Sequence, residues 1–60
     1  MTKNEARHDL VMLSYGTLAT LTGIRKFDDL DDMLSAKLDA IEHTDVSECS
    51  KWQDVWEKLA

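Results

Sequence analysis

Apolar residues recur every three or four positions along the first part of the chain, which is the spacing of one face of an α-helix. The residues on this face are Ala6, Leu10, Leu13, Thr17, Leu21 and Ile24. Thr2 and Glu5 have the spacing of a capping box at its start, and Gly23 is a natural stop because glycine adopts the left-handed conformation without penalty. The pattern predicts one helix over residues 3–22. Gly16 lies inside it, where glycine costs about 1 kcal/mol relative to alanine, so a break at this position is left open.

Two further stretches have the same periodicity. The second predicts a helix over residues 28–43, entered through Phe27, with apolar positions at Leu30, Met33, Leu34, Leu38 and Ile41. The third predicts a helix over residues 46–59, with an apolar stripe of Val46, Cys49, Trp52, Val55, Trp56 and Leu59. Its start is open between Thr44 and Ser50, because Ser50 and Gln53 have the spacing of another capping box. Strand signals such as alternating β-branched runs are absent.

These helices predict an all-α fold in a single domain, residues 1–60: a small three-helix bundle, or a helical hairpin with a third helix. A chain of 60 residues buries only about 60% of the surface that its unfolded form exposes, so homodimerisation is an open way to complete the core. Cys49 is the only cysteine, which excludes an internal disulfide and suits a reducing cytosol. We therefore expect a cytoplasmic protein.

The charge of the chain narrows the choice of partners. Twelve acidic residues against seven basic ones give a net charge of −5. Nonspecific binding to nucleic acid draws its affinity from Lys and Arg that displace counterions, so this balance argues against nucleic acid. It argues equally against an anionic membrane surface, and the most apolar run, residues 10–24, is too short and too polar to span a bilayer. A protein partner fits better, especially one with a basic surface.

An acidic patch is predicted at the start of the second helix. It consists of Asp28, Asp29, Asp31 and Asp32. Carboxylates at a helix start offset the positive end of the helix dipole and accept hydrogen bonds from free backbone N–H groups. A calcium loop would need a central glycine and a terminal glutamate, and here Leu30 interrupts the run and no glycine follows. The patch is interpreted as a solvated helix start or as a docking patch for a basic protein.

The stretch GTLATLTGI, residues 16–24, resembles the first helix and turn of the helix-turn-helix in many bacterial repressors. The resemblance ends beyond the turn. The positions at which a recognition helix buries aliphatic side chains hold Asp29 and Asp32, and Leu30 and Met33 are one residue out of register. Carboxylates on the outer face would repel phosphates, and they lack the donor groups that contact guanine.

Two DNA-related functions stay open as alternatives. One is a helix-turn-helix-like transcription regulator that contacts DNA through Arg25 and Lys26. The other is an acidic DNA mimic that inhibits a DNA-binding protein with the acidic patch. The net charge of −5 is small for a dedicated mimic.

The sequence offers no combination of residues for catalysis, for a cofactor or for a metal. A glycine-rich phosphate loop and a nucleophile elbow are both absent. His8, His43 and Cys49 are the only soft metal ligands, and none of them forms the close pair that is typical of zinc sites. We therefore expect a protein that is not an enzyme.

Trp52 and Trp56 lie four residues apart, so one helix face presents both rings. They either close the small core or anchor an interface with another protein, because tryptophan is enriched among residues that dominate binding energy. Both rings are hard to bury completely in a bundle this small. Tyr15 and Met12 are predicted to extend the same patch, which makes these four side chains the candidate protein-interface residues.

The opening MTKNEARHDL, the size and the acidic helical composition together resemble small acidic accessory proteins of temperate lambda-like bacteriophages. The resemblance implies expression in a bacterial host cytoplasm and a role in phage or host development through protein contacts, with a host protein as a candidate partner. It has no diagnostic motif, so no functional residue is carried over. The leading hypothesis is a noncatalytic helical accessory or regulatory factor that acts by protein–protein interaction.

Overall fold

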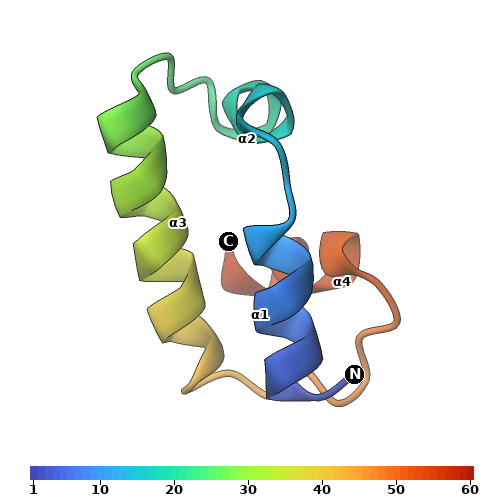
Figure 1. Cartoon of the computed structure of the whole chain (residues 1–60). Helices are drawn as coiled ribbons and strands as arrows, with labels where there is room; N and C mark the ends of the chain where they lie inside the picture. The colour runs from blue at the N-terminus through green and yellow to red at the C-terminus, as the bar shows by residue number, and fades with distance from the viewer.

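The computed structural model describes all 60 residues and contains four helices and no strand. They are α1 (Lys3–Val11), α2 (Tyr15–Thr22), α3 (Phe27–Ile41) and α4 (Trp52–Leu59). Figure 1 shows α1 beside α3, α4 crossing behind α1, and α2, seen end-on, near the end at which α3 begins. Helices α1, α3 and α4 all pack against one another, whereas α2 packs only against α3. The predicted all-α class is confirmed, although the small bundle has four helices rather than three.

One cluster of buried side chains joins α1, the end of α3 and α4. It consists of Ala6, Leu10, Ile41, Val46, Cys49 and Val55, and we call it the main core. Each large apolar side chain buried in this way contributes about 1.5–3 kcal/mol. At its edge an ion pair joins Arg7 to Glu42, and the Lys3 ammonium donates to the Glu42 carbonyl at 2.8 Å. Such exposed contacts add less than about 1 kcal/mol, so apolar burial dominates.

The helix expected over residues 3–22 is wrong in one respect, because it is divided into α1 and α2. The break lies just before Tyr15 and not at Gly16, which is helical. Ser14 has an extended backbone, and its hydroxyl oxygen accepts the N–H of Thr17 at 3.2 Å. A serine that accepts this bond caps a new helix, so Ser14 restarts the chain in another direction.

The other predicted helix signals of this region are confirmed. The Thr2 hydroxyl oxygen accepts the Glu5 N–H and the Glu5 carboxylate accepts the Thr2 N–H, both at 3.1 Å, which completes the capping box. Gly23 ends α2 with a φ of 77°, and its N–H donates to the Ala19 carbonyl at 2.8 Å. Local chemistry therefore decides where α1 begins and where α2 ends.

The third expected helix, residues 46–59, begins later than predicted. The Asp45 carboxylate accepts the N–H of Ser47 at 3.0 Å, and a local bond of this kind competes with helix formation. Ser50 lies just before α4, and Asp54 lies in its first turn. The N–H and the hydroxyl of Ser50 donate to one carboxylate oxygen of Asp54 at 3.1 and 2.9 Å. These bonds hold the pKa of Asp54 below its usual 3.8. The N-cap of α4 is Lys51, so the capping box expected from Ser50 and Gln53 is wrong, and Ser50 pairs with Asp54 instead.

The part of the molecule around α2 has a much smaller interior. We call α2 together with residues 23–32 the α2 end. Only Leu18 and Leu30 are buried in it, and neither belongs to the main core. The α2 end therefore leaves more of its apolar side chains facing solvent.

Candidate functional site

Helix α4 presents Trp52 and Trp56 one turn apart, and both side chains are half-buried. Each packs against the main core with part of its surface. The Lys37 ammonium lies 5.2 Å from the Trp56 ring centroid and also donates to the Leu59 carbonyl at 3.3 Å. A cation at this distance from an indole is attracted to the ring. The core and Lys37 therefore hold the Trp56 ring in place while part of the ring stays exposed.

An open hollow separates α2 from α4. It has a volume of about 130 Å³ and is lined by Leu21, Trp52, Gln53, Trp56 and Glu57. We call it the tryptophan hollow. Pockets for drug-sized molecules measure about 300–1,000 Å³, so this hollow suits a single side chain better than a cofactor. Its lining is mainly apolar, with one amide and one carboxylate among the residues that surround it.

Tyr15 does not line this hollow. It is the first residue of α2 and lies against Phe27, the first residue of α3, with the ring centroids 4.9 Å apart. Its hydroxyl donates to a carboxylate oxygen of Asp31 at 2.7 Å. This hydrogen bond is the main reason that the pKa of Tyr15 is raised above its usual 10.0, and the charges of Asp31 and Asp28 add to the effect. Tyr15 and Phe27 form a separate feature, which we call the aromatic pair.

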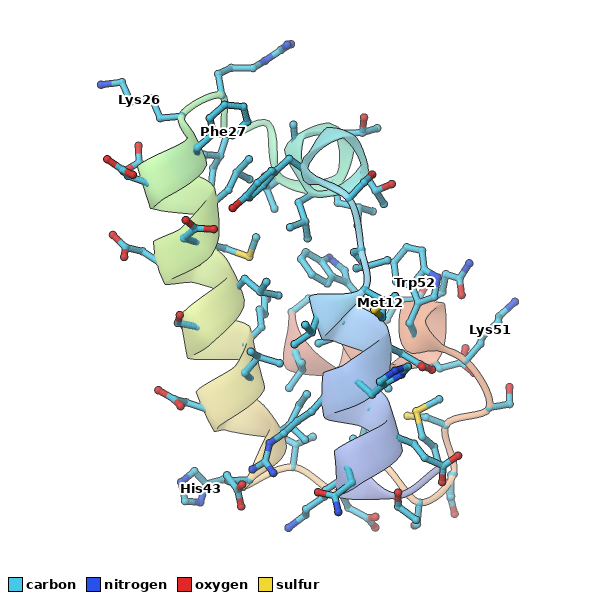
Figure 2. The ribbon with its side chains drawn as sticks, viewed as in Figure 1. Met12, Lys26, Phe27, His43, Lys51 and Trp52 are labelled. Atoms are coloured by element: carbon cyan, nitrogen blue, oxygen red, sulfur yellow. The ribbon has the colours of Figure 1, made fainter.

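The structure thus brings together two of the four candidate interface residues, Trp52 and Trp56. Met12 is the C-terminal cap of α1 and is 71% exposed, but it is not part of the hollow's lining. Figure 2 shows Met12 at the end of α1 and Trp52 at the start of α4. Leu21 was not predicted as a site residue, because its spacing places it on the buried face of one long helix. The change of direction at Ser14 exposes 42% of Leu21.

All four members of the acidic patch are exposed and none forms an ion pair. They are Asp28, Asp29, Asp31 and Asp32. Leu30 is buried while Asp29 and Asp32 face solvent, as their register predicts. Arg25 and Lys26, in the connection between α2 and α3, are the nearest basic residues along the chain. The outward surface of α3 is therefore acidic, which is unfavourable for a helix that reads DNA.

The remaining candidate ligands are far from forming a site. His8 and His43 are exposed and Cys49 is buried in the main core. The structure brings together no group of three or more His, Cys, Asp or Glu side chains that is able to hold a metal ion. None of the four helices has both the length and the apolar composition that crossing a membrane requires.

Comparison with known proteins identifies no relative. No protein-family model matches the chain, and no curated protein and no solved structure matches it either.

Proposed function

We propose that this is a noncatalytic binding protein whose tryptophan hollow receives an apolar side chain of another protein. The observation that carries the proposal is the lining itself: two half-buried indole rings and Leu21 surround an open hollow. Tryptophan is prominent among residues that dominate binding energy. Because the rings already pack against the main core, little side-chain freedom is lost when a partner binds.

The surroundings of the hollow favour a particular kind of anchor. Gln53 and Glu57 line it beside the apolar residues, and the whole chain carries a net charge of −5. An apolar side chain next to a basic one would fill the hollow and pair with the Glu57 carboxylate. The resemblance to phage accessory proteins supports a regulatory role in a bacterial host cytoplasm, with a host protein as that partner.

The two DNA-related alternatives receive less support. A transcription regulator would have to bind through α3, whose outward residues Asp29 and Asp32 repel phosphate. A DNA mimic would need a dense array of free carboxylates, but Asp31 is engaged by Tyr15 and the bases Arg25 and Lys26 lie close by in sequence. Neither alternative gives a role to the tryptophan hollow.

A matched pair of variants tests the proposal. Leu21→Ser removes one apolar wall of the hollow, whereas Val11→Ser makes the same kind of change at a residue that is 55% exposed and lies outside the lining. Affinity capture from bacterial lysate with the wild type and both variants should yield a partner that Leu21→Ser loses and Val11→Ser keeps. Circular dichroism should show equal helix content for all three proteins.

Binding of the purified partner should also change the emission of the two tryptophans, since their rings line the contact. The proposal would be wrong if the wild type retained no partner at physiological salt. It would be equally wrong if both serine variants retained the same partner as the wild type with unchanged affinity.

A further inference from the structure

The aromatic pair at the α2 end is exposed and lies outside the main core. Phe27 is 66% exposed and Tyr15 is 45% exposed, and neither packs against the main core. Figure 2 shows Phe27 at the start of α3, at the opposite end of this helix from His43. Exposed apolar surface is unfavourable by about 25 cal/mol per Å², so covering these two rings would release free energy that the monomer does not gain.

Opposite charges lie on the two sides of Phe27 along the chain. Arg25 and Lys26 precede it, and Asp28 and Asp29 follow it; all four are exposed. The ion pair of Arg7 with Glu42 and the contact of His8 with Asp9 include none of these four residues, so the four charges have no ion-pair partner within the chain. In Figure 2 the Lys26 side chain projects away from the ribbon. Two copies of this segment in opposite directions are complementary, because the bases of each then face the acids of the other.

A second copy of the chain fits this surface better than a partner of one charge. A basic peptide would pair with the aspartates but would meet Arg25 and Lys26. In a two-fold contact the same patch lies on both sides, so the bases of one copy can face the acids of the other while the aromatic pairs cover each other. Helix α2 carries no charged residue, so its neighbouring surface adds no repulsion between like charges.

We propose that two copies associate around a two-fold axis beside Phe27, with Arg25 and Lys26 of each copy facing Asp28 and Asp29 of the other. A stable interface buries about 800 Å² per partner, which is about one fifth of the 4063 Å² surface of this chain. A patch at one end covers less than that. The dissociation constant of the dimer is therefore in the micromolar range or above. The dimer leaves the tryptophan hollow open because the two surfaces share no residue.

Sedimentation equilibrium of the full chain, from low micromolar to millimolar concentrations, tests this dimer. The wild type should show a monomer–dimer equilibrium. Arg25→Glu with Lys26→Glu, and separately Asp28→Lys with Asp29→Lys, should each weaken association about tenfold or more. An equimolar mixture of the two reversed proteins should recover association as a heterodimer, since each then supplies the charges that the other needs.

The net charge provides the control. Reversing the two bases takes the net charge from −5 to −9, so the remote reversal Lys51→Glu with Lys58→Glu, which gives the same −9, should weaken association less. Reversing the two acids takes the net charge to −1, which lowers general repulsion, and yet association should still fall. A wild type that stays monomeric at millimolar concentration overturns the proposal. So does a mixture of the reversed proteins that fails to associate.

Discussion

The main core and the α2 end differ in how completely they bury their apolar side chains. The main core collects six buried residues from α1, α3, the 46–49 segment and α4. The α2 end buries only Leu18 and Leu30, and it carries the exposed side chains of Tyr15, Leu21 and Phe27. Helix α2 also packs against a single neighbour, whereas α1, α3 and α4 pack against each other. One region holds the fold together, and the other offers apolar surface to solvent.

This difference suggests a division of roles within a very short chain. Elements with few buried contacts open at lower free energy than the core elements, and binding surfaces are commonly drawn from such elements. Both proposed contact surfaces, the tryptophan hollow and the aromatic pair, include a residue of α2. The α2 end is thus expected to be the more easily opened region, and it contributes a residue to each proposed contact surface.

The largest expected effect comes from deleting the same side chain in each region. Leu10 and Leu18 are 0% and 1% exposed, so Leu10→Ala and Leu18→Ala remove equal buried volumes. Leu10→Ala should destabilise the protein by about 3–5 kcal/mol, which approaches the whole stability of about 3–9 kcal/mol expected for a chain of this length. Leu18→Ala should lower global stability by less than about 2 kcal/mol, since the α2 end can open while the main core stays closed.

Urea unfolding followed by circular dichroism measures both changes, and hydrogen exchange locates them. In Leu18→Ala the α2 amides should exchange faster while the α4 amides keep their protection. Equal losses in the two variants would mean that the main core and the α2 end form one cooperative unit.

A smaller change in stability is expected when either glycine of the α2 end is replaced by alanine, and its sign differs between the two positions. Gly23 has a φ of 77°, so Gly23→Ala forces a side chain into the left-handed region and should cost about 1–2 kcal/mol. Gly16 is helical, and an added Cβ would meet only the Ser14 hydroxyl oxygen, at 3.8 Å. Gly16→Ala should therefore stabilise α2 by about 0.5–1 kcal/mol.

Both glycine effects should appear in the hydrogen exchange of α2 amides and scarcely in the exchange of α4. A change of the same sign for both variants would show that the space and the backbone angles around these glycines are not what the structure describes.

The smallest effect concerns the titration of Tyr15, which is the only tyrosine in the chain. Its pKa is raised above 10.0, chiefly because its hydroxyl donates to Asp31. The protonated form is the one that the fold favours. The contribution of this bond to stability is therefore complete below pH 10 and is lost as the pH rises through the raised pKa.

Phenolate absorbance follows this titration directly. Asp31→Ala should move the pKa of Tyr15 down towards its usual value, because both the hydrogen-bond acceptor and the carboxylate charge disappear. Asp39→Ala removes a carboxylate elsewhere on α3 and should leave the pKa of Tyr15 unchanged. If the two variants titrate alike, the bond between α2 and α3 is not what raises the pKa.

Sequence alone predicted the features that depend on neighbouring residues. The capping box of Thr2 with Glu5, the stop at Gly23 and the outward position of Asp29 and Asp32 all follow from local chemistry or from helical register, and the structure confirms them. The break before Tyr15 was missed, because the apolar spacing continues across it and conceals that Ser14 begins a new helix. The late start of α4 was missed because the apolar stripe also continues through the turn at Asp45.

The candidate site was predictable only in part, for the same reason. The spacing of Trp52 and Trp56 shows that they share a face, but it does not show what lies opposite. Their neighbour across the hollow, Leu21, comes from a distant part of the sequence and reaches this place only because the chain turns at Ser14. Tyr15 was predicted to belong to the same patch because the turn at Ser14 was not foreseen. In the structure it lies against Phe27.

Cys49 provides a chemical probe of how often the buried interior becomes accessible. It is the only cysteine, and it is buried in the main core with 7% of its surface exposed. It lies in the connection between α3 and α4, so a thiol reagent reaches it when this connection or the main core opens. The labelling rate of Cys49 therefore reports the opening of this part of the molecule, and opening of the α2 end alone should not raise it.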